Sequence, residues 1–139
     1  MGALLAKENI WYVGTQDPNL RVFDIIMHSD WGTSYNAYLV KGSEKTALFE
    51  TSKLEFFDEF LANVREVCDP ASIDYIVVDH TEPDHSGSLE KLLALAPNAT
   101  VLGSATALNF LKQIVNHEFA CRAVTEKDTV DLGGMTLHF

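Results

Sequence analysis

Four potential metal ligands lie within six consecutive positions of this chain, at His80, Glu82, Asp84 and His85. They follow the apolar run Tyr75–Val78, whose short length and β-branched residues predict a buried strand. In open α/β sheets, ligand sites lie at the carboxyl ends of the strands. Imidazole nitrogen suits iron, zinc and copper, whereas carboxylate oxygen suits harder ions. So many ligands at one strand end predict a site for two metals rather than one.

The spacing of these ligands has a physical logic. His80 and Glu82 are two positions apart, so in an extended turn both side chains can point toward one ion, while Asp84 and His85 can turn to a second. Two metals about 3.5–4 Å apart can jointly hold one small substrate. Pro83 stiffens the turn and lowers the entropy lost on binding. A polar surface loop without metal is the alternative, and four potential ligands after a buried strand disfavour it.

Composition indicates a single globular domain with an acidic surface. The chain has 139 residues, a hydrophobic fraction of 47% and a formal net charge of −10. No run of Lys or Arg is present, which argues against nucleic acid and anionic membranes as partners. No segment approaches the roughly 18 apolar residues that a membrane span needs.

The ends and the cysteines favour a cytoplasmic protein. The apolar start Met1–Ala6 is short, lacks a basic leader and is followed at once by Lys7, so it does not resemble a signal peptide. Cys68 and Cys121 lie far apart without CxxC spacing, and we expect both to be reduced thiols.

The first half of the chain predicts a β meander followed by a helix. Ser52 is expected to cap that helix, with Glu55 completing a capping box, and Asp69–Pro70 is expected to end it. The strands expected before the helix are Ile10–Val13, Arg21–Met27, Tyr35–Lys41 and Thr46–Phe49.

The second half alternates strands and helices, which predicts a layered α/β domain. A hydroxyl in Ser86–Ser88 is expected to cap the first helix after the metal loop. The final strand alternates apolar residues up to Phe139 without a polar tail, and we therefore expect that the chain has been cut. The expected elements are the strand Tyr75–Val78, the helix Leu89–Leu95, the strand Thr100–Leu102, the helix Ala105–Asn116, and the strands Arg122–Val124, Val130–Leu132 and Met135–Phe139.

The segment His80–Leu89, HTEPDHSGSL, resembles the metal motif of flavodiiron proteins, which belong to the metallo-β-lactamase-like superfamily. Gly32–Val40 resembles an early strand of that family, Ser72–Val78 the strand leading into the motif, and the Gly133–Gly134 turn with Phe139 a later hairpin. The resemblance covers nearly the whole chain. Hydrolases of the superfamily carry His where this chain has Glu82, and Glu marks the diiron branch.

The resemblance implies an α/β fold, the metallo-β-lactamase-like αββα sandwich, of which residues 1–139 would form the N-terminal half. It also implies that His80 and Glu82 bind one iron and that Asp84 and His85 bind the other. Three further ligands, a His, a bridging Asp and a last His, are expected beyond Phe139. A C-terminal flavodoxin-like domain with FMN is absent from this chain.

By the same resemblance, the parent protein is an oxidoreductase that reduces O2 to water or NO to N2O with electrons from FMN. Its implied partners are an electron donor, such as rubredoxin or a flavin/NADH reductase, and a second copy in a homodimer or larger assembly. One alternative is a hydrolase of the superfamily with a dinuclear zinc site. Another is a non-catalytic metal-binding or dimerising fragment.

Several further residues are candidates around the site. Glu50 stands where the family usually has an Asp that supports the metal loop. His28 is a candidate for a role beside the metals, with a loop histidine as the alternative. Asp79 could orient a ligand imidazole as an outer acceptor. We interpret His117 as a helix-end residue that favours the helix dipole, and His138 as exposed.

Overall fold

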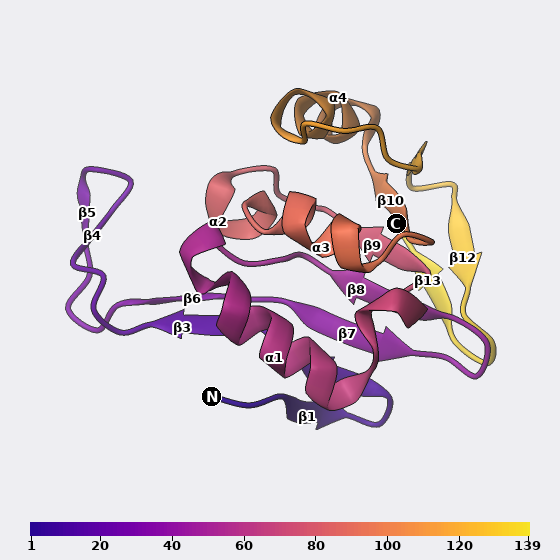
Figure 1. Cartoon of the computed structure of the whole chain (residues 1–139), viewed down its shortest axis with the longest axis horizontal. Helices are drawn as coiled ribbons and strands as arrows, with labels where there is room; N and C mark the ends of the chain where they lie inside the picture. The colour runs from indigo at the N-terminus through magenta and orange to yellow at the C-terminus, as the bar shows by residue number, and fades with distance from the viewer.

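The computed structural model describes residues 1–139 and is built on a seven-stranded mixed sheet (Figure 1). Neighbouring strands are antiparallel from one edge of the sheet to the central strand, and parallel from the central strand to the other edge. The strands are, in spatial order, β1 (Leu4–Lys7), β2 (Ile10–Tyr12), β7 (Tyr38–Lys41), β8 (Thr46–Phe49), β9 (Tyr75–Val77), β10 (Thr100–Gly103) and β11 (Cys121–Ala123). This arrangement confirms the α/β class.

Helices cover one face of this sheet, with α1 and α3 lying across it in Figure 1. The larger core lies between the helices and the sheet, and it includes the fully buried side chains of Leu48, Phe60, Ile76 and Leu92. No helix is both long enough and apolar enough to cross a membrane. The helical elements are η1 (Leu54–Phe56), α1 (Phe57–Val67), η2 (Pro70–Ser72), α2 (Pro83–Ser86), α3 (Leu89–Leu95) and α4 (Ala105–Ile114).

The opposite face of the sheet is covered in part by a hairpin of β12 (Thr129–Asp131) and β13 (Thr136–His138). A smaller core lies here, because alternate residues of a strand point to opposite faces of its sheet. The half-buried side chains of Met135, Leu137 and Phe139 pack against this smaller core. The apolar residues of the last strand are thus partly buried against other residues of the same chain.

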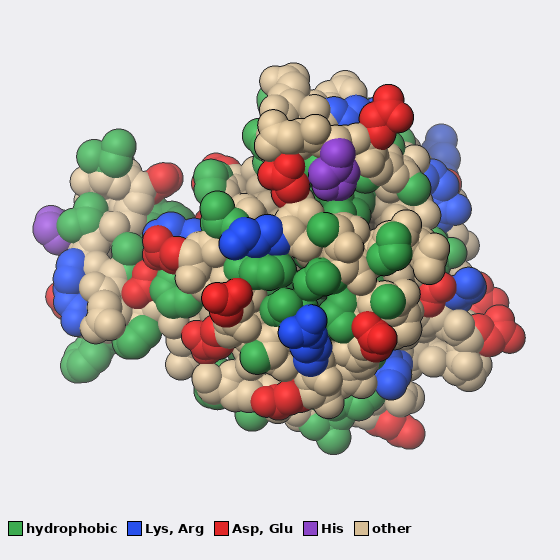
Figure 2. Space-filling view, viewed as in Figure 1, with side chains coloured by type: hydrophobic (Ala, Val, Ile, Leu, Met, Phe, Trp, Pro, Cys, Tyr) green, Lys and Arg blue, Asp and Glu red, His purple; other side chains and the backbone are tan.

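Two short ribbons extend from the sheet toward one end of the molecule (Figure 1). β3 (Thr15–Asp17) pairs with β6 (Thr33–Tyr35), and beyond them β4 (Val22–Phe23) pairs with β5 (Met27–His28). Figure 2 shows hydrophobic side chains on this projection, and the most exposed are Ile25, Ile26 and Trp31.

The expected strand Arg21–Met27 is wrong, because the chain reverses there. Asp24 and Ile25 adopt positive φ angles of 52° and 72°, which form the turn between β4 and β5. The expected strand Tyr35–Lys41 is also divided. Tyr35 ends β6, which pairs with β3, and Tyr38 begins β7, which pairs with β2. The strands β1 and β3 were not predicted, since neither has a clear alternating pattern.

The predicted capping box at Ser52 and Glu55 is wrong. The first helical turn begins after Lys53 and has no side-chain cap. Ser52 is fully buried, and its Oγ lies 3.1 Å from Oγ of Ser88. Glu55 instead forms an ion pair with Lys53 at 2.7 Å. Helix α4 ends at Ile114, two residues before its predicted end.

We expect Leu48→Ala to lower the free energy of unfolding by about 2–5 kcal/mol, because Leu48 is fully buried at the centre of the sheet. Leu5→Ala removes the same atoms from a side chain that is 65% exposed, and it should change stability by less than about 0.5 kcal/mol. Urea unfolding followed by circular dichroism measures both values. Equal losses for the two variants would contradict the assigned core.

Candidate metal centre

The metal loop begins where the parallel strand β9 ends and closes in the short helix α2. Pro83 occupies the first turn of α2, where its fixed φ and missing N–H carry no penalty. The backbone N–H groups of His85 and Ser86 both donate to the carbonyl of Glu82. His80 and Glu82 therefore lie on the extended part of the loop, and Asp84 and His85 lie in a helical turn.

The expected serine cap after the loop is wrong, because α3 has no side-chain cap at Ser88. Ser86 is instead the last residue of α2, a short helix that precedes the expected one. Its hydroxyl donates to the carbonyls of Thr81 and Glu82 at 2.7 and 3.1 Å. These bonds close the loop on itself, so the serine hydroxyl orders the ligand segment rather than the following helix.

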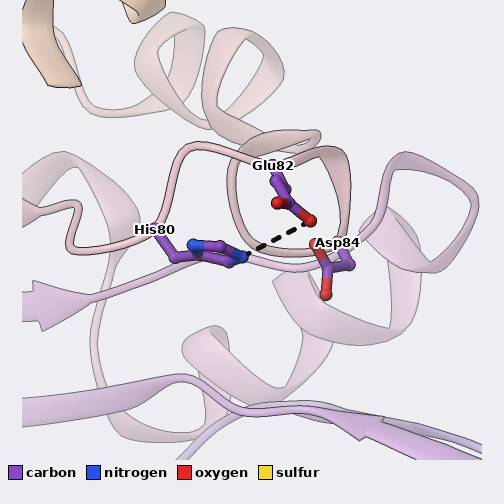
Figure 3. Close-up of side chains that lie close together, drawn as sticks. All are labelled: His80, Glu82 and Asp84. Carbon is purple, nitrogen blue, oxygen red and sulfur yellow. Dashed lines mark ion pairs between the residues drawn. The ribbon is translucent and has the colours of Figure 1, made fainter. Parts of the chain in front are cut away.

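The structure brings the four predicted ligands together in two adjacent pairs. Nε2 of His80 lies 3.5 Å from Oε2 of Glu82, and Nε2 of His85 lies 3.4 Å from Oδ2 of Asp84. The two imidazole ring centres are 5.0 Å apart. Figure 3 shows the side chains of His80, Glu82 and Asp84 converging, and their ligand atoms all lie within 4.8 Å of one another.

This donor set fits cations that accept both nitrogen and oxygen ligands. Two imidazoles and two carboxylates are the ligand types of iron and zinc sites, and carboxylates also suit harder ions. His80 and Glu82 are each about half exposed, whereas the side chains of Asp84 and His85 are only 16% and 24% exposed. One pair of ligands therefore lies deeper in the protein than the other.

The side chain of Glu50 contacts the loop at several points. It follows β8, adopts a φ of +62°, and is buried. Its Oε1 accepts hydrogen bonds from the backbone N–H groups of Asp79 and His80, and its Oε2 lies 3.3 Å from Nδ1 of His85. Burial raises the pKa of Glu50 to about 7, although the two backbone hydrogen bonds act in the opposite direction. The Glu at this position thus contacts both ends of the ligand loop.

The next two residues, Thr51 and Ser52, also form hydrogen bonds with the ligand loop and the residues after it. The N–H and the hydroxyl of Thr51 both donate to the carbonyl of His85, at 2.9 and 2.6 Å. The carbonyl of Ser52 accepts from the N–H of Ser88 at 3.0 Å. Sequence reasoning missed this role, although the signal was available: a polar Glu-Thr-Ser run follows a strand that runs parallel to β9.

A cleft of about 220 Å³ lies beside the ligand loop. Glu82 and Asp84 of the loop line it, together with Phe23 and Tyr35 from the projecting ribbons. The hydroxyl of Tyr35 donates to the buried Asp17 at 3.2 Å, and burial together with this carboxylate raises the Tyr35 pKa to about 12. A larger cavity, of about 720 Å³, lies away from the loop and is lined by eight residues between Lys112 and Cys121, at the end of α4.

The side chains of the other candidate residues form no hydrogen bond or ion pair with this cluster. His28 is exposed on β5, and its side chain makes no hydrogen bond or ion pair. Asp79 is exposed, and its carboxylate contacts no imidazole. His138 is exposed as expected, and Nδ1 of the exposed His117 lies 3.0 Å from the carbonyl of its neighbour Glu118.

We expect Thr51→Val to lower the free energy of unfolding by about 0.5–1.5 kcal/mol, because valine keeps the shape but loses the bond to the His85 carbonyl. Thr51→Ser keeps the hydroxyl and should lose less. Urea unfolding gives the stabilities, and amide hydrogen exchange of residues 84–88 reports loop opening. The assignment fails if valine and serine have the same effect on exchange.

The chain matches known proteins over its whole length. Residues 33–139 match the model of the ODP family beta lactamase. The chain is 49% identical over 141 residues to flavo-diiron protein FprA2 of Clostridium acetobutylicum, covering 100% of this chain and 35% of that protein. It therefore spans about a third of the length of this relative.

Solved structures agree with the sequence relatives. The crystal structure of the flavodiiron protein from Giardia intestinalis matches with a TM-score of 0.93 and 28% identity, covering 99% of this chain and 34% of that one. Rubredoxin oxygen:oxidoreductase from Desulfovibrio gigas matches with a TM-score of 0.90 and 34% identity, covering 96% and 33%. The chain belongs to the ODP family of β-lactamase domains, and its residues correspond to the N-terminal β-lactamase-like domain of flavodiiron proteins.

Proposed function

We propose that this chain supplies ligands to a non-haem diiron centre in an oxidoreductase that reduces O2 to water, NO to N2O, or both. The observation that carries this proposal is the cluster of His80, Glu82 and Asp84, with ligand atoms within 4.8 Å of one another, beside His85. It lies at the end of β9 in a chain of the ODP family. A relative that is 34% identical is named as a rubredoxin oxygen:oxidoreductase.

In this proposal, His80 and Glu82 bind one iron, and Asp84 and His85 bind the other. The carboxylate of Asp84 lies within reach of both pairs, so it can attract both cations. Residues 1–139 then form one part of a diiron domain, and further ligands come from residues outside this chain. Bound iron would supply the redox chemistry for a diatomic substrate.

The cleft beside the site has a volume of only about 220 Å³, which favours a small substrate. Phe23 and Tyr35 line the cleft together with Glu82 and Asp84, so part of its wall is apolar. The hydrogen bond from Tyr35 to Asp17 keeps that hydroxyl occupied and its ring in place. Glu50 and Thr51 hold the backbone of the ligand loop, which limits how far the ligands can move apart.

Electrons are proposed to come from FMN, which no residue of this chain is assigned to bind. Rubredoxin or a flavin/NADH reductase is the proposed donor to that flavin. The proposed location is the cytoplasm, where a donor of this kind would be available and where the two free thiols, Cys68 and Cys121, would stay reduced.

Metal and flavin analysis of the full-length protein that contains this sequence tests the proposal. We expect about two irons and one FMN per chain, together with consumption of O2 or NO when a reduced donor is added. A protein that holds two zinc ions and no flavin would overturn it, because two zincs activate water for hydrolysis rather than reduce a diatomic.

We expect Glu82→His to shift the metal preference toward zinc, because it replaces a hard carboxylate oxygen with an imidazole nitrogen. The measurement is the iron-to-zinc ratio retained after incubation with equal concentrations of Fe²⁺ and Zn²⁺ without oxygen. Glu118→His is the matched control, since Glu118 is an exposed glutamate outside the cluster. An unchanged ratio in Glu82→His would argue against Glu82 as a ligand.

We also propose that the chain associates with a second copy of itself through the free edge of β13. β12 is the only strand paired with β13, so the other edge of β13 presents unpaired backbone groups. Size-exclusion chromatography should give an apparent mass above the 15.4 kDa of one chain. Thr136→Lys adds a charge to this edge at an exposed position and should favour the monomer, whereas a monomeric parent chain would contradict the proposal.

A further inference from the structure

The imidazole of His85 lies between two carboxylates. Its Nδ1 is 3.3 Å from Oε2 of Glu50, and its Nε2 is 3.4 Å from Oδ2 of Asp84. A neutral imidazole carries one proton, so it can donate to only one of these two groups. The position of that proton decides which nitrogen keeps a lone pair for a metal ion.

Burial separates the two sides of the ring. Oε2 of Glu50 and Nδ1 of His85 are both inaccessible to solvent, and neither has another hydrogen-bond partner. The other oxygen of Glu50 is already used, because it accepts from the N–H groups of Asp79 and His80. A buried carboxylate oxygen facing an unprotonated ring nitrogen would leave two polar atoms unsatisfied, which is unfavourable. A proton on Nδ1 satisfies both atoms at once.

On the opposite side of the ring, Nε2 can find a hydrogen-bond or ligand partner outside the protein. Nε2 of His85 and the carboxylate of Asp84 are not among the buried unpartnered atoms, and both side chains are partly exposed. Water or a cation can reach them. A cation held between Nε2 and Asp84 would replace a repulsion of lone pairs with two favourable contacts.

We propose that Glu50 is a positioning residue that holds His85 in its Nδ1–H tautomer and so keeps Nε2 available as a metal ligand. Carboxylates commonly orient metal-binding imidazoles in this way. The tautomer follows from the geometry of Glu50 and His85 alone, whereas the metal at Nε2 rests on the proposed function. The two statements can therefore fail separately.

The tautomer can be measured directly in the metal-free chain with ¹⁵N-labelled histidine. Long-range ¹H–¹⁵N correlation spectra at about pH 8, above the usual imidazole pKa of about 6.5, separate Nδ1–H from Nε2–H rings. His85 should appear as the Nδ1–H form. An Nε2–H ring at His85 would overturn the inference. Because this measurement uses the parent chain, its result does not depend on whether a variant folds.

Glu50→Gln should reverse the tautomer. The backbone N–H groups of Asp79 and His80 require an acceptor, so the amide oxygen takes the place of Oε1 and the amide nitrogen faces His85. A donor in that position makes Nδ1 the acceptor and moves the ring proton to Nε2. Asp79→Asn is the matched control, because it removes a nearby exposed carboxylate that contacts no imidazole. An unchanged tautomer in Glu50→Gln would contradict the inference.

Zinc, which is diamagnetic, serves as the probe for the metal. In the parent chain, Zn²⁺ should shift the Nε2 resonance of His85, and Glu50→Gln should weaken that response about 10- to 100-fold. The response of His80, whose imidazole does not contact the Glu50 carboxylate, should change much less. If the tautomer behaves as expected but no histidine of the loop responds to Zn²⁺, the positioning role stands and the proposed metal site is what fails.

Discussion

The parallel pairing of β8 with β9 is the constraint on which the candidate site depends. It places the residues that leave β8 directly beside the residues that leave β9. Glu50, Thr51 and Ser52 then reach the backbone at both ends of the ligand loop. Residues 79–85 of the loop are all at least partly exposed, so hydrogen bonds from the buried polar segment after β8 define its shape.

The charge of the site also shapes its chemistry. Glu82 and Asp84 lie in one cluster with His80, and Lys53, which lines the same cleft as the two carboxylates, is paired with Glu55. Burial raises the pKa of Glu50, because removal from water disfavours its charged form. Cations bound by the imidazoles and carboxylates would supply positive charge. The arrangement is therefore more costly without metal than with it.

Much of the architecture could be predicted from the sequence where local signals agreed with the fold. The apolar run before Asp79 predicted β9, and the spacing of His80 to His85 predicted one cluster, because a short loop cannot separate its own residues widely. Ser52 was misassigned because a cap motif is a local signal, whereas its hydroxyl is used by Ser88, 36 residues later. The turn at Asp24–Ile25 carried no glycine to mark it.

The projecting ribbons help to shape the cleft, whereas a different part of the fold carries the candidate ligands. β3–β6 and β4–β5 form two-stranded sheets of their own, outside the seven-stranded sheet that carries the ligand loop. Phe23 and Asp24 nevertheless reach the cleft beside Glu82 and Asp84. Substitutions in this arm can thus alter the shape of the cleft without disturbing the strand ends that carry the ligands. Evolution, or an engineer, can vary access to the site while leaving the candidate ligands in place.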